Sequence, residues 1–143
     1  MPRYFTLANA AQALPQVEKL IREALFLKSD CQTAGDELTA TTRHIMMMGG
    51  VQVDSNRLNA VKQTRDRSFE RLKGILEEIQ ETGCLVKDLD IGLLDFPTLY
   101  RGEEVYLCWK LGESSINFWH PVHEGFGGRR PIDQEFLDNH ASK

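Results

Sequence analysis

Chemically capable side chains gather in the segment from Gly92 to Arg129. The segment reads GLLDFP, EEVYLCWKLGE, INFWH and GFGGR in that order, and it holds both tryptophans of the chain. A segment that only filled a hydrophobic core would not need ionisable groups among these aromatic residues. The groups in question are Asp95, Glu113, His120 and Arg129. We therefore place the candidate functional site in this segment.

His120 is the most versatile of these groups, because a neutral imidazole binds metal ions and exchanges protons near neutral pH. Asp95 and Glu113 could supply carboxylate ligands beside it, and Arg129 could hold an anion. The alternative is a structural network in which these groups satisfy one another's hydrogen bonds. The sequence has neither an H-E-x-x-H nor a C-x-x-C spacing, so it predicts no particular metal ion.

The strand register decides which of these side chains can meet. The residues GESS predict a turn between the strands EVYLCWKL and INFWH, which would pair Leu107 with His120. Cys108 would then face Trp119, on the opposite side of the sheet from His120. This register argues against a site shared by Cys108 and His120, although a bulge of one residue would exchange every face. Cys108 is accordingly interpreted as an inert buried thiol.

Two long helices and a small sheet must position the segment. Apolar residues recur every three or four positions and predict one helix from about Gln16 to Met48. A second helix is predicted from a cap at Asp54 or Ser55 to a stop at Gly83. Thr6 can cap a first helical turn, whereas Pro15 either ends a short first helix or begins the long one. After the second helix the apolar period changes to two, which predicts about three short strands.

The predicted fold is therefore α+β: a long antiparallel helical hairpin with a small C-terminal antiparallel β-sheet of about three strands. We expect a single domain, 1–143. Residues 1–83 would form the hairpin region, 84–132 the sheet and a glycine-rich loop, and 133–143 an irregular tail. Because a hairpin alone cannot cover two apolar stripes, we expect a homo-oligomer, with a dimer favoured.

Composition and charge restrict the partners and the location. The net charge of the 143 residues is −4, without a basic stripe, so we expect no nucleic-acid partner. No run approaches the about 18 apolar residues of a membrane span, and the N-terminus lacks a secretory pattern. The 3 cysteines are widely spaced and indicate reduced thiols. We expect a cytoplasmic protein without a membrane partner.

The combination GLLDFP, EEVYLCWKLGE, WH and GFGGR resembles the signature of an uncharacterised bacterial family known only as a domain of unknown function. Members read approximately GLVDFP, REVYLCWRLGE, WH and GFAGRQP, and the opening FTLANAAQALPQV is similar as well. The resemblance extends over almost the whole chain. It departs at Arg130, where members commonly have glutamine, and His123 has no firm counterpart. It implies a helical region followed by the C-terminal module, and it implies no activity.

Two functions remain open at the level of the sequence. In the first, the C-terminal module binds a divalent metal ion or a small anionic ligand. His120, Glu113 and Asp95 would be metal ligands or acid–base groups, and Arg129 would clamp the anion. In the second, the chain is a non-catalytic homodimeric helical interaction module, and the same residues form a structural network. The sequence does not decide whether the protein is an enzyme.

Overall fold

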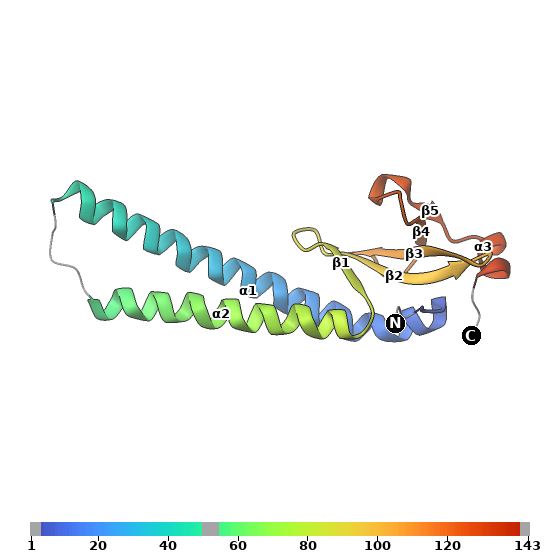
Figure 1. Ribbon diagram of the computed structural model, residues 1–143, viewed down its shortest axis with the longest axis horizontal. Helices are drawn as coiled ribbons and strands as arrows, with labels where there is room; N and C mark the ends of the chain where they lie inside the picture. Colours follow the sequence, from blue (N-terminus) through green and yellow to red (C-terminus); the bar gives the residue numbers. More distant parts are fainter. Residues whose placement is uncertain (1–3, 50–54, 141–143) are drawn as a thin grey trace. The chain divides into compact units, whose positions relative to one another are not determined.

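The computed structural model describes residues 4–49 and 55–140, and it divides the chain into two compact units. The sheet unit comprises Met1–Arg22 and Leu76–Lys143, and the hairpin unit comprises Glu23–Ile75. Figure 1 labels the helices and strands in chain order. The two units are described separately below.

Two long helices dominate the first half of the chain, as the apolar spacing predicts. Helix α1 spans Leu7–Met47 and helix α2 spans Ser55–Glu81. The prediction of a break at Pro15 is wrong, because α1 continues through this residue. Leu14 and Val17, on either side of the proline, are buried. The burial of such neighbours offsets the lost hydrogen bond and the strain of a proline inside a helix.

The helix ends follow their local sequence. Thr6 caps α1 as predicted, because its Oγ1 accepts a hydrogen bond of 3.0 Å from the Asn9 N–H. At the other end, Gly49 has a φ of 67°, a left-handed conformation that glycine adopts without strain. The proposed cap at Asp54 lies outside the described residues, and Ser55 is the first residue of α2.

Within the hairpin unit the two helices run antiparallel. Residues that are early in α1 contact residues that are late in α2: Glu23 pairs with Arg71 at 3.0 Å, and Asp30 accepts a hydrogen bond of 3.2 Å from Ser68. Further along, Glu37 pairs with Arg57 at 2.7 Å. The predicted helical hairpin is therefore confirmed. Its association with a second copy stays a prediction.

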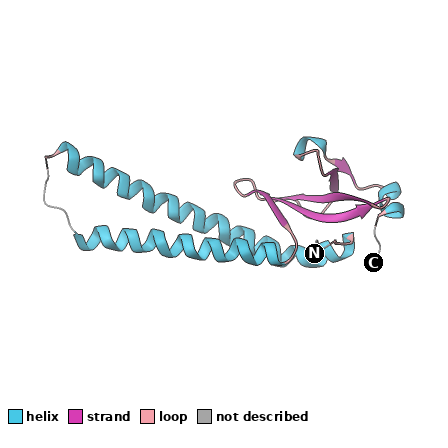
Figure 2. Cartoon of the chain, viewed as in Figure 1, coloured by secondary structure: helices cyan, strands magenta, loops and turns pink. Residues whose placement is uncertain are grey.

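The sheet unit contains a 5-stranded antiparallel sheet in the order β1-β2-β3-β4-β5 (Figure 2). Its strands are Leu85–Asp88, Leu93–Tyr100, Glu103–Lys110, Phe118–Pro121 and Arg130–Pro131. The prediction of about three strands is too low for two reasons. First, a turn closed by the Gly92 N–H and the Leu89 carbonyl splits one predicted strand into β1 and β2. Second, the glycine-rich loop returns to the sheet edge as β5.

The C-terminal segment is not the irregular tail that the sequence predicts. It contains helix α3, Gln134–Asn139, whose Asp133 cap accepts a hydrogen bond of 2.9 Å from the Phe136 N–H. Phe136 is buried, and its ring lies 5.1 Å from the ring of Tyr100 and 5.0 Å from that of Trp119. This aromatic anchor orders a segment whose composition alone does not predict a helix.

The two faces of the sheet have different neighbours. We call the side that bears Phe96, Leu107 and Trp119 the core face. It packs on aromatic side chains from outside the sheet, since the ring of Phe96 meets that of Phe5 at 5.2 Å and Trp119 meets Phe136. The other side, the ligand face, bears Asp95, Tyr106, Cys108, Phe118 and His120.

Candidate metal centre

A tight hairpin between β2 and β3 places Asp95 beside Cys108. Arg101 and Gly102 form its two-residue turn with φ values of 51° and 80°, so Tyr100 pairs with Glu103. Positive φ at both turn residues is typical of the type I′ turn, whose twist suits a two-residue hairpin. From this turn the antiparallel register runs without interruption to the pair Asp95 and Cys108.

The register between β3 and β4 brings His120 to the same face. His120 pairs with Tyr106, and Cys108 pairs with Phe118. The predicted pairing of Leu107 with His120 is wrong by one residue, and this slip exchanges the faces. The argument that a regular hairpin separates Cys108 from His120 is therefore wrong as well.

Glu113 lies in the connection between β3 and β4 and contacts the end of β3. Just beyond β3, the Leu111 N–H donates to the Gly92 carbonyl on the β2 side, so the preceding Lys110 N–H points towards β4. The Glu113 carboxylate accepts a hydrogen bond of 2.6 Å from this Lys110 N–H. The Glu113 side chain thus occupies the place of a strand partner at this end of β3.

Three side chains on the ligand face form a cluster with metal-binding chemistry. One ligand atom of each of Asp95, Cys108 and His120 can be chosen so that all lie within 4.8 Å of one another. The residues are almost fully buried, with exposures of 1%, 0% and 3%. Each comes from a different strand, so the sheet holds all three backbones rigidly. The edge of the Tyr106 ring also faces His120, with 5.5 Å between ring centroids.

The hydrogen bonds of His120 fix the role of its two ring nitrogens. His120 Nδ1 lies 2.8 Å from the Pro121 carbonyl, which can only accept, so Nδ1 carries a proton. Nε2 lies 3.1 Å from both carboxylate oxygens of Asp95. In the neutral imidazole the Nε2 lone pair would face these oxygens, which is repulsive. A proton or a metal ion between Nε2 and the carboxylate removes this repulsion.

Cys108 carries its proton in the metal-free protein. Burial, followed by the negative charge of Asp95, raises the pKa of the Cys108 thiol to about 12, although the Arg129 guanidinium acts in the opposite direction. A metal ion that binds this thiol must displace the proton, since the thiolate is the ligand.

Glu113 and Arg129 form a separate pair beside the cluster. Arg129 Nη2 donates hydrogen bonds of 2.7 Å to both carboxylate oxygens of Glu113. The Glu113 carbonyl also accepts a hydrogen bond of 3.0 Å from Trp109 Nε1. The structure thus brings two of the predicted candidates, Asp95 and His120, into direct contact. The other two candidates, Glu113 and Arg129, pair with each other instead. Their contact orders the loop that follows β3.

Cys108 is the member of the cluster that sequence reasoning missed. The signal that could have found it is Gly102 between two apolar strands, because glycine suits the positive φ of a two-residue hairpin turn. The residue pairs counted outward from this turn include Asp95 with Cys108. The register of β4 has no comparable local signal.

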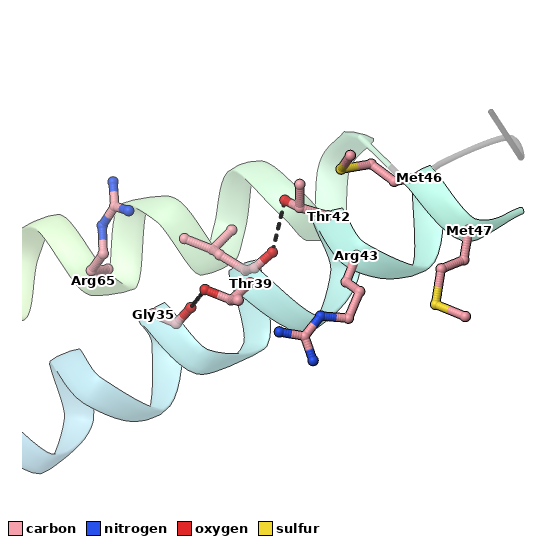
Figure 3. Close-up of a pocket in the computed structure, with 8 residues that line it drawn as sticks. Gly35, Thr39, Thr42, Arg43, Met46, Met47 and Arg65 are labelled. Carbon is pink, nitrogen blue, oxygen red and sulfur yellow. Dashed lines mark hydrogen bonds between the residues drawn. The ribbon is translucent and has the colours of Figure 1, made fainter. Parts of the chain in front are cut away.

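A cavity in the hairpin unit offers different chemistry. It has a volume of about 800 Å³ and is lined by Gly35, Leu38, Thr39, Thr42, Arg43, Met46, Met47 and Arg65 (Figure 3). The hydroxyls of Thr39 and Thr42 donate to the carbonyls of Gly35 and Leu38, within the same helix. No histidine, cysteine or carboxylate is among the described residues that line this cavity.

Comparison with known proteins identifies the family. Residues 3–132 match the family described as an uncharacterized conserved protein, DUF2203. The chain belongs to the DUF2203 family. The match spans both long helices, the strands that bear Asp95, Cys108 and His120, and the glycine-rich loop of this DUF2203 protein. No curated protein and no solved structure matches the chain.

The helices give no indication of a membrane span. Within residues 4–49 and 55–140, no helix combines the length and the apolar character that a span requires.

Proposed function

We propose that this DUF2203 protein binds a divalent transition-metal ion through Asp95, Cys108 and His120. The observation that supports this most is the orientation of His120. Its Nδ1 proton is engaged by the Pro121 carbonyl, so Nε2 is the nitrogen that could bind a metal ion, and it lies 3.1 Å from both Asp95 carboxylate oxygens. A metal ion relieves the repulsion between the Nε2 lone pair and these oxygens, and a carbonyl behind the ring is a usual support for a metal-binding histidine.

The chemistry of the ligands favours zinc and its neighbours in the first transition series. The cluster combines one carboxylate oxygen, one sulfur and one imidazole nitrogen. Mg²⁺ and Ca²⁺ prefer oxygen ligands alone, whereas a thiolate with an imidazole suits Zn²⁺, Co²⁺ or Fe²⁺. Three protein ligands are typical of zinc sites that also hold a non-protein ligand.

A titration of metal-free protein with Co²⁺ tests the proposal. Thiolate coordination should produce an intense sulfur-to-cobalt absorption band, and one equivalent of Zn²⁺ should abolish the band by displacement. Cys108→Ser should lose the band, while His120→Gln should weaken Co²⁺ binding by at least about tenfold. If wild-type protein lacks the band and its melting temperature does not change when Zn²⁺ is added, a proton and not a metal ion lies between His120 and Asp95.

The other cysteines provide matched controls. Cys84 is also buried in the sheet unit, and Cys31 lies in the hairpin unit. Cys84→Ala and Cys31→Ser should both keep the Co²⁺ band. A band that survives Cys108→Ser but disappears in one of these variants would assign the thiolate ligand elsewhere.

A second candidate function is homodimerisation through the hairpin unit. Phe26 and Phe69 are 69% and 57% exposed on its two helices, and Met46 and Met47 are 78% and 79% exposed. Large apolar side chains in contact with water favour association. Sedimentation velocity of wild-type protein and of the double variant Phe26→Ser, Phe69→Ser tests this. A wild-type monomer at micromolar concentration would contradict it.

A further inference from the structure

The Arg129 guanidinium lies on the ligand face, next to the proposed metal centre. Phe118 is the cross-strand partner of Cys108, so the two side chains are neighbours on this face. Arg129 Cζ lies 4.1 Å from the centroid of the Phe118 ring and 4.7 Å from that of Phe126. Two aromatic rings thus hold the guanidinium beside Cys108.

One hydrogen-bond donor of Arg129 lacks an acceptor within the described part of the chain. Its Nη2 is engaged by Glu113, but its buried Nε–H has no acceptor among the residues that the structure describes. A buried donor without a partner destabilises a protein. The guanidinium is planar and suits ligands with two oxygen atoms. The Nε–H is therefore available to an acceptor that the described residues do not supply.

The metal centre supplies the second half of such a site. Three protein ligands leave one position of a tetrahedral ion for a non-protein ligand. A hard oxygen donor can take this position. The same molecule must also reach the guanidinium, so it needs a second oxygen atom.

We propose that a small oxyanion, of the phosphate or carboxylate class, bridges the metal ion and Arg129. One oxygen atom coordinates the metal ion, and another accepts a hydrogen bond from Arg129 Nε. This inference rests on the proposed metal centre. Glu113 holds the guanidinium in place through Nη2 and also accepts a hydrogen bond from the Lys110 N–H at the end of β3.

The Co²⁺-loaded protein provides the test. Inorganic phosphate and acetate are each titrated while the visible d–d bands of Co²⁺ are recorded, with chloride at the same ionic strength as the reference. A saturable spectral change with phosphate alone assigns the phosphate class, and one with acetate alone assigns the carboxylate class. If neither changes the spectrum beyond chloride, the oxyanion proposal is overturned, while the metal centre stands on its own Co²⁺ band.

Variants of two neighbouring arginines distinguish a specific contact of Arg129 with the oxyanion from a general effect of positive charge. Arg129→Gln, compared with wild type after both are saturated with Co²⁺, should bind the oxyanion at least about tenfold more weakly. Arg130→Gln is the matched control, because Arg130 is 49% exposed and pairs with Glu124 at 3.1 Å. It should bind the oxyanion as wild type does. Arg129→Lys keeps the charge but lacks Nε, so it should show the weakened affinity too; wild-type affinity in either Arg129 variant would refute the role of Nε.

Discussion

The sheet unit and the hairpin unit bury different kinds of residue. The sheet unit encloses Asp95, Thr98 and His120 among aromatic side chains, whereas the hairpin unit buries small or aliphatic residues and one polar residue, Ser68. The hairpin also leaves Phe26 and Phe69 largely in water. Burial of an ionisable group costs free energy unless it is paired, so a buried imidazole and carboxylate mark a site more clearly than a large cavity does.

The largest difference between the units should appear in stability. Trp109→Ala removes a fully buried side chain of the sheet unit and should lower the free energy of unfolding by about 3–5 kcal/mol. Phe26→Ala removes a mainly exposed ring of the hairpin unit. It should change the free energy of unfolding by no more than about 0.5 kcal/mol. Urea denaturation measures both. Equal losses would mean that Phe26 is buried in solution, as the homodimer requires.

Metal affinity should depend steeply on pH. The Cys108 thiol, whose pKa is about 12, is protonated below that pH, so the metal ion must displace its proton. Apparent affinity should therefore rise with pH, by about tenfold per unit for the proton displaced from Cys108. Calorimetry in two buffers counts the protons released. An affinity that does not change between about pH 6 and 8 would exclude Cys108 as a ligand.

Loss of the Glu113 charge should have an intermediate effect. Glu113→Gln weakens the contact with Arg129, whose side chain is 11% exposed, and should cost about 1–3 kcal/mol. Glu124→Gln is the control, because Glu124 meets Arg130, an arginine that is 49% exposed. Glu124→Gln should lower the free energy of unfolding by less than about 1 kcal/mol. If Glu113→Gln also reduces Co²⁺ affinity, the loop after β3 positions the ligands as inferred.

The cap of α1 should contribute a smaller amount. Thr6→Ala removes the oxygen that accepts from the Asn9 N–H and should cost about 1 kcal/mol. Thr6→Ser keeps this oxygen and should retain most of the stability. Thermal unfolding distinguishes the two variants, and an equal loss in both would assign the effect to the missing methyl group.

The smallest effect should come from an ion pair of the hairpin unit. Arg71→Gln breaks the pair with Glu23, whose side chains are 63% and 37% exposed, and should cost less than about 1 kcal/mol. The difference from wild type should shrink further at high salt, because salt screens exposed charges. If Arg71→Gln lowers the free energy of unfolding more than Glu113→Gln does, the exposed ion pair of the hairpin unit is more stabilising than the partly buried pair of the sheet unit, contrary to this prediction.

Local patterns in the sequence predicted the helices and singled out two members of the cluster, Asp95 and His120. The helices follow from apolar spacing, the Thr6 cap from residue type, and the involvement of Asp95 and His120 from ionisable groups among aromatics. Burial overrode these patterns at Pro15, where packing holds the helix together, and at Phe136, which anchors a helix in the expected tail.

The sequence by itself determined which chemical groups are present and which elements hold them. Only the tertiary structure decided which groups meet. The site depends on the pairing of β3 with β4, and there a shift of one residue exchanges every face. At the connection between these strands Glu113 contacts Lys110 and Arg129, and Arg129 is 16 residues from Glu113 along the chain. Cys108 therefore meets His120 through the pairing of β3 with β4, and no local pattern in the sequence fixes the register of that pairing.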